Sequence, residues 1–203
     1  MRTATFSTDF ALSVSTRIAQ RVKRLPKGQP FCISRFAELG ARGAISKAVA
    51  RLVSQGELER VHRGIYMRPK SSQYVARVRP NVWEVVSLIA RQNRQVLQIH
   101  GANAVRAFGL STQMPLIPIY YTSGPSRSLF IGKAEVRLVH AAPKVMQCAG
   151  TEVGTAISAL FYLGKDGSSP ECIAAIKKML RPEDIVKLMA CKMPKWMRMA
   201  LEA

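Results

Sequence analysis

Acidic residues are scarce in this sequence. Its 203 residues contain 12 Asp and Glu against 31 Lys and Arg, which gives a formal net charge of +19 at pH 7. Such an excess favours polyanionic partners, with nucleic acid as the leading candidate and an anionic membrane surface or an acidic protein as alternatives. It disfavours a metal-dependent nuclease, which needs at least two converging carboxylates to hold a divalent ion. Only three aspartates occur, Asp9, Asp166 and Asp184, and none neighbours another acid in a strand context.

Paired cysteines and long apolar runs are also missing. The four cysteines, Cys32, Cys148, Cys172 and Cys191, are far apart, without a C-x-x-C pair or a histidine at metal-ligand spacing. We interpret them as small core residues of a protein in a reducing compartment. No stretch approaches the roughly 18 apolar residues of a membrane helix, and no signal-peptide pattern opens the chain. The sequence therefore predicts a cytoplasmic protein that needs no membrane, metal or cofactor.

The length allows one large domain or two small ones, and the charge is distributed unevenly between the two halves of the chain. Hydrophobic residues make up 48% of the chain and charged residues 21%, as in globular proteins. Residues 1–80 carry 16 Lys and Arg against 4 acids, a net charge of +12, whereas residues 81–203 carry 15 against 8, a net charge of +7. We expect a basic N-terminal domain over residues 10–70 and a second domain over residues 81–203. The segment 69–80 is bracketed by prolines and is interpreted as a linker.

The first domain is predicted to contain three helices and a hairpin. Apolar residues at helical spacing predict a helix over 14–25, followed by a short extended piece over 30–33. Ser34 is a candidate N-cap of a brief second helix, whose inward residues would be Phe36, Ala37 and Leu39. A tight connection over 41–43 would lead to a third helix over 44–55, closed by a left-handed Gly56.

Two strands over 57–61 and 65–68, joined by residues 62–64, follow the third helix. This order of elements is typical of a winged helix-turn-helix, in which the third helix enters the major groove and the hairpin contacts backbone or minor groove. The candidate DNA-binding residues are Arg42, Ser46, Lys47, Arg51, His62 and Arg63. The alternative is an ordinary α/β core fragment whose basic face is merely solvated.

The second domain is predicted to be mixed α/β with a helical C-terminal end, so the fold class is α+β. Two of its patterns have a functional alternative. The loop 122–127, TSGPSR, could cradle an anion, but an ordinary polar turn is the preferred interpretation. Glu135 and Arg137 loosely resemble part of a restriction-type nuclease core, but no upstream Asp completes it, so a solvent-facing cross-strand pair is preferred. An apolar face with Trp196 and Met197 is either core or a docking surface.

Three stretches of the sequence together resemble a known family. They are SRFAELGARGAISKAVARLVSQGELERVHRGIYMRP, then IHGANAVRAFGLSTQMP, then IYYTSGPSR with LFIGKAEVRLVH, which span roughly residues 34–140, with weaker similarity in ACKMPKWM. The chain resembles the AbiEi-type antitoxins and transcriptional regulators of type IV toxin–antitoxin systems, in an uncharacterised branch of that superfamily. The resemblance implies an N-terminal winged helix that represses its own promoter and a C-terminal domain that supports antitoxin action against a nucleotidyltransferase-like toxin.

We therefore expect a sequence-specific DNA-binding transcriptional regulator, the autorepressing antitoxin of such a system, and not an enzyme. The expected partners are double-stranded DNA of its own promoter, a nucleotidyltransferase-like toxin and a second copy of the chain. Two alternatives stay open. One is a protein-interaction module that neutralises the toxin without regulating DNA, and the other is a nuclease-like enzyme.

Overall fold

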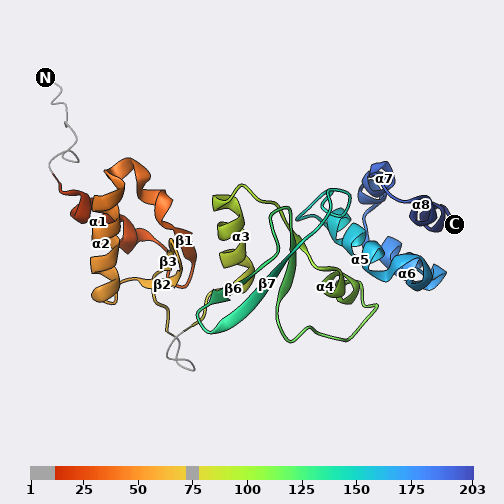
Figure 1. Ribbon diagram of the computed structural model, residues 1–203, viewed down its shortest axis with the longest axis horizontal. Coiled ribbons are helices and arrows are strands. Elements are labelled where there is room, and N and C mark those ends of the chain that lie inside the picture. The colour runs from red at the N-terminus through yellow and green to blue at the C-terminus, as the bar shows by residue number, and fades with distance from the viewer. Residues whose placement is uncertain (1–11, 72–77) are drawn as a thin grey trace, which may run out of the picture. The chain divides into compact units, whose positions relative to one another are not determined.

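The computed structural model describes residues 12–71 and 78–203 (Figure 1). The chain folds as two compact units, of which the first ends at Ile89 and the second begins at Ala90. The boundary falls inside helix α3 (Val82–Gln92), later than the expected domain start at residue 81. Residues 72–77 of the expected linker 69–80 lie outside the described residues. Both units combine helices with a small sheet, which confirms the α+β class.

The first unit contains the expected succession of elements. Helix α1 (Val14–Arg24) leads to strand β1 (Pro30–Cys32), the 3-10 helix η2 (Ile33–Leu39) and helix α2 (Arg42–Ser54). Strands β2 (Glu59–His62) and β3 (Ile65–Met67) then form the hairpin. The sheet has the order β1-β3-β2 and is antiparallel throughout. Helix α2 begins two residues before its predicted start, so the expected connection 41–43 supplies the first helical turn.

Helices α1, η2 and α2 of the first unit pack on one apolar core. Its fully buried members include Ile18 of α1, Phe36 of η2 and Val49 of α2. Phe36 contacts Phe31 of β1 edge to face, with 5.7 Å between the ring centroids, a favoured arrangement of aromatic rings. The remaining buried members of this core are Val22, Leu39, Ile45, Ala48, Leu52 and Leu58. The predicted apolar stripes of α1 and α2 are thus confirmed as the faces that meet in the interior.

The second helix differs from its prediction in both its cap and its buried face. Its N-cap is Cys32, not Ser34, because the Cys32 Sγ accepts hydrogen bonds from the Ser34 N–H at 3.3 Å and the Ser34 hydroxyl at 2.8 Å. Ala37 is exposed, although it was expected to face inward. A 3-10 helix has three residues per turn, so the side chains that share a face are three residues apart, as Phe36 and Leu39 are.

Two glycines shape the ends of α2. A Cβ on Gly40, in the turn before the helix, would lie 2.7 Å from Cγ2 of Val14, so this turn approaches α1 more closely than another residue type allows. Gly56, with φ of +72°, follows the last turn. Its N–H donates to the Val53 carbonyl and the Glu57 N–H donates to the Leu52 carbonyl, which together form a Schellman motif. The predicted left-handed cap at Gly56 is confirmed, and it directs the chain into the hairpin.

The second unit begins with a four-stranded mixed sheet. Its strands are β4 (Leu97–Ile99), β5 (Ile119–Thr122), β6 (Arg127–Ile131) and β7 (Ala134–His140), in the order β4-β5-β7-β6. Strands β5 and β7 pair in parallel, and the other two pairings are antiparallel. The tight β6–β7 hairpin turns at Gly132 and Lys133. Helix α4 (Gly101–Ala107) connects β4 to the loop before β5.

The helices that follow the sheet close the second core (Figure 1). They are α5 (Glu152–Gly167), α6 (Pro170–Met179), α7 (Pro182–Ala190) and α8 (Lys195–Glu202). Gly164, with φ of +67°, breaks the regular geometry of helix α5, and the chain continues after a kink. Proline opens both α6 and α7. Among the described residues, no helix has the length and apolar content that a membrane crossing requires.

The apolar stripe of the C-terminal helix belongs to this core. Met197 is fully buried, Leu201 is nearly so, and Trp196 packs against them from the edge. The interpretation of the Trp196 and Met197 face as core is therefore confirmed, and its alternative as a docking surface is wrong. The amphipathic pattern of α8 identifies an apolar face but does not tell whether the same chain covers it.

Candidate nucleic-acid interface

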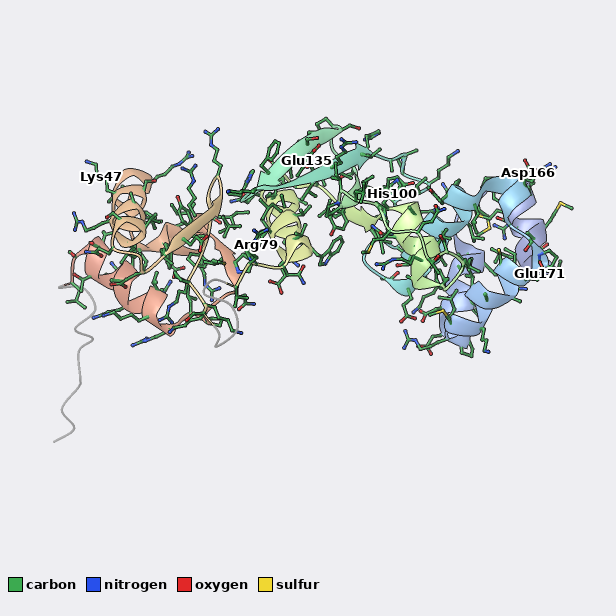
Figure 2. The ribbon with its side chains drawn as sticks, turned by 90° about the horizontal axis from the view of Figure 1, so that it is seen from below. Lys47, Arg79, His100, Glu135, Asp166 and Glu171 are labelled. Carbon is green, nitrogen blue, oxygen red and sulfur yellow. The ribbon has the colours of Figure 1, made fainter. Side chains whose placement is uncertain are left out.

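The exposed face of α2 carries the candidate cations. Ile45, Val49 and Leu52 point into the core, so the opposite side of the helix is left to solvent. Ser46, Lys47 and Arg51 are exposed there, as their positions relative to the apolar stripe predict. Lys47 lies near the middle of the helix (Figure 2), and within the described ranges no carboxylate pairs with it. This face offers a cation without an internal counter-ion.

The N-terminal end of α2 adds backbone donors to this face. Ala41 occupies the N-cap position and its side chain makes no capping hydrogen bond. The amides of the first turn therefore lack a side-chain acceptor, and the helix dipole adds a partial positive charge at the same end. Arg42 begins the helix and is exposed beside these amides. Together they provide the donors that an anionic oxygen requires.

The side chain of Arg51 contacts helix α1, which the sequence did not indicate. Its Nη1 donates to Oγ of Ser15 at 3.5 Å, which links the C-terminal half of α2 to the first turn of α1. Arg51 is nevertheless exposed. Because a 3.5 Å hydrogen bond is long and therefore weak, the guanidinium is oriented by α1 without being neutralised.

The β2–β3 hairpin presents a second group of candidates. Its turn consists of Arg63 and Gly64, and Gly64 has φ of +76°, a conformation that glycine adopts without strain. Arg63 is exposed at the tip, whereas His62 is half-buried, so these two neighbours differ in their access to a ligand. A register irregularity lies between Arg60 and His62. Arg60 is exposed on β2 and was not among the candidate DNA-binding residues. Its position in a short basic strand close to the turn is the sequence feature that could have identified it as a candidate.

Other basic residues of the first unit have structural partners. Arg21 of α1 pairs with Glu38 of η2. Arg68 donates from Nη1 to the carbonyls of Lys23 and Leu25, both at 2.7 Å, and so satisfies acceptors at the end of α1. The net charge of this unit is therefore divided between cations that hold the fold together and cations, such as Lys47 and Arg63, that do not.

The loop 122–127 of the second unit uses its hydroxyls internally. The Ser123 Oγ accepts from the Val96 N–H at 2.9 Å, and the Ser126 Oγ accepts from the His140 N–H at 2.8 Å. Arg127 donates to the Gln95 side chain at 2.8 Å. These bonds tie the loop to its neighbouring strands, as expected of a polar turn.

The acidic candidates of the second unit are engaged in pairs. Glu135 accepts from Arg137 Nε at 3.1 Å and from Ser128 Oγ on the neighbouring strand at 2.9 Å. These hydrogen bonds lower the pKa of Glu135, and the bond from Arg137 has the largest effect. Asp184 accepts from Arg181 at 2.8 Å and from Lys187 at 3.3 Å. Asp9 lies outside the described residues, and the described part of the chain contains no cluster of three or more potential metal ligands.

The cysteines do not all fit the expectation of isolated core residues. Cys148, in the loop after β7, is exposed, and its Sγ lies 3.9 Å from Sγ of Cys191 at the end of α7. The two are 43 residues apart in the sequence. Spacing along the chain gave no signal of this proximity, because only the packing of the helical end brings the two loops together.

The chain belongs to a family of unknown function, DUF6088, whose sequence profile matches residues 17–188. This match covers both units. Among solved structures, the chain is similar to the crystal structure of RV2827C protein from Mycobacterium tuberculosis, with 14% sequence identity and a TM-score of 0.43. That similarity covers 94% of this chain and 71% of the other. No curated protein matches the chain.

Proposed function

We propose that the first unit is a winged helix-turn-helix that binds double-stranded DNA sequence-specifically, and that the protein is a transcriptional regulator of its own promoter. The observation that carries this proposal is the solvent-exposed cationic face of α2, with Lys47 at its centre and no described acidic partner. The order α1-β1-η2-α2-β2-β3, with β3 in the middle of the sheet, supports it as well.

Each candidate residue has a role in this proposal. Helix α2 enters the major groove with its N-terminal end first, so Lys47 and Ser46 read base edges while Arg42 and the amides beside it bind a phosphate. Arg51, oriented by Ser15, contacts the next base or phosphate along the groove. Arg63 at the hairpin tip engages the backbone or the minor groove, and His62 supports it from a half-buried position. Because two-fold DNA sites mirror two-fold proteins, a palindromic operator would require a homodimer.

The test is binding to DNA from the region upstream of the protein's own gene, measured by gel shift at fixed salt. A Lys47→Ala/Arg51→Ala double variant is expected to lose affinity for this DNA. The matched control is Lys133→Ala/Lys178→Ala, which removes the same two charges from exposed positions of the second unit. Unaltered affinity in the α2 variant, or an equal loss in the control, would overturn the assignment of α2 as the reading helix.

The resemblance to AbiEi-type antitoxins extends the proposal to the second unit, which would bind a nucleotidyltransferase-like toxin. The observation that favours a protein partner is a group of exposed apolar side chains. Met114 and Leu116 lie in the loop between α4 and β5, and Phe130 lies on β6. Large apolar residues with this degree of exposure are candidates for contact with a protein partner. Co-purification with the product of a neighbouring gene tests this role, and a Leu116→Ser variant is expected to weaken it while DNA binding is retained.

A further inference from the structure

Two loops of the second unit are fastened to each other at the point where Cys148 and Cys191 meet. The Gln147 side chain donates to the Lys192 carbonyl at 2.8 Å and accepts from the Lys192 N–H at 2.8 Å. From the other side, Arg198 of α8 donates to the carbonyls of Met189 at 3.0 Å and of Cys191 at 3.3 Å. The residues next to both cysteines are thus held in place, and the sulfur atoms lie 3.9 Å apart.

The two thiols have different surroundings. Cys148 is exposed, and its φ of +51° is a left-handed conformation that residues with a Cβ rarely adopt. Such a conformation persists where the surrounding structure imposes it. Cys191 is buried, and its thiol donates to the Lys187 carbonyl at 3.3 Å. The pKa of Cys191 is raised to about 11, mainly by burial and secondly by the interaction with Cys148. Cys148 is therefore the thiol that a reagent in solution reaches first.

We propose that Cys148 and Cys191 form a reversible intramolecular disulfide when the protein encounters a hydroperoxide, and that this bond fastens the α7–α8 end of the second unit to the loop after β7. The sulfur atoms need to approach by about 2 Å to reach disulfide length, which a rotation of the exposed Cys148 side chain can supply. The pair is a redox-sensitive site that goes beyond the proposed DNA-binding role.

The reaction proceeds in two balanced steps. The Cys148 thiolate attacks one peroxide oxygen, the O–O bond breaks, and Cys148 becomes a sulfenic acid while the other oxygen leaves as an alcohol or as water. The Cys191 sulfur then attacks the sulfenic sulfur, the S–O bond breaks, and the hydroxide leaves as water with the proton of Cys191. Two thiols lose two electrons in total and the peroxide is reduced. A dithiol reverses the reaction, as expected in a reducing compartment.

The other two cysteines serve as internal controls. Cys32 caps η2 in the first unit, and Cys172 lies half-buried in the first turn of α6. Cys172 belongs to the same unit as the pair, so Cys172→Ser removes a thiol without touching the proposed site.

The experiment uses the full chain, reduced and then treated with hydrogen peroxide in slight excess. The free thiols, counted after denaturation, are expected to fall from four to two. The intact mass should fall by about 2 Da, and a peptide map should join Cys148 to Cys191. In Cys172→Ser the count should fall from three to one. Cys148→Ser should keep all three thiols, whereas Cys191→Ala should keep two, because its Cys148 is left as a sulfenic acid that no second thiol resolves. The bond closes a loop of about 44 residues, so the oxidised protein should unfold on the order of 5 °C higher, and dithiothreitol should reverse the shift.

Four remaining thiols after treatment would overturn the proposal, as would a bond between another pair or between two chains. The peptide map of the wild-type protein decides the matter even where a variant fails to fold. DNA affinity is not part of any of these measurements, so the failure of this proposal is distinguishable from the failure of the proposed function.

Discussion

Replacement of Lys47 by alanine tests whether α2 reads the DNA sequence or is only exposed to solvent. Lys47 is exposed in the middle of α2 and has no acidic partner among the described residues, so its removal breaks no ion pair of the folded protein. Alanine also has a slightly higher helix propensity than lysine. We therefore expect the free energy of unfolding to change by less than about 0.5 kcal/mol, and any loss of DNA affinity to come from the complex itself.

The expected loss depends on the DNA sequence. On an operator selected by the wild-type protein, loss of a base contact should cost roughly 1–3 kcal/mol, which weakens binding about 5- to 150-fold. On random DNA the same variant loses at most one phosphate contact, so log affinity against log salt should become shallower by no more than about 0.9. Arg63→Ala is the matched comparison, because a hairpin-tip contact to backbone should weaken all sequences alike.

The assay is fluorescence anisotropy at two salt concentrations, with the selected operator and a scrambled duplex of the same length. Circular dichroism of each variant confirms that its fold is intact. The reasoning fails if Lys47→Ala binds both duplexes as the wild type does. It also fails if the variant loses the same factor on both, because Lys47 would then contribute charge without reading sequence.

Three further predictions follow from the same structure. If about six phosphates are neutralised, log affinity should fall with log salt at a slope of about −5, and a slope near zero would exclude backbone binding. Phe36→Ala removes a fully buried ring that packs on Phe31, so urea unfolding of the first unit should show a loss of about 3–5 kcal/mol; an unchanged midpoint would contradict the described core. The hydrogen bond from Arg181 lowers the pKa of Asp184 below its ordinary value of 3.8, so this carboxylate stabilises the fold above about pH 4 and the contribution disappears as pH falls through the lowered pKa. Asp184→Asn should therefore lower Tm at pH 7 and reduce the difference in Tm between pH 7 and pH 3, and an unchanged difference would refute this role.

The sequence by itself determined those features that depend on neighbours along the chain. The helical spacing of Ile45, Val49 and Leu52 identified the buried face of α2, and with it the exposed position of Lys47. Gly56 and the Gly132 hairpin turn were equally predictable, because a left-handed or tight backbone restricts the residue type directly. Such patterns succeed because residues a few positions apart must satisfy the geometry of one helix or one turn.

Only the tertiary structure decided which distant groups meet. It brought Cys148 to Cys191, linked Arg51 to Ser15 of α1, and covered Met197 with the rest of the helical core. It also decided that the second helix is a 3-10 helix. These outcomes depend on how whole elements pack against each other. The residues around an apolar stripe or a single thiol do not indicate which distant part of the chain will pack against it.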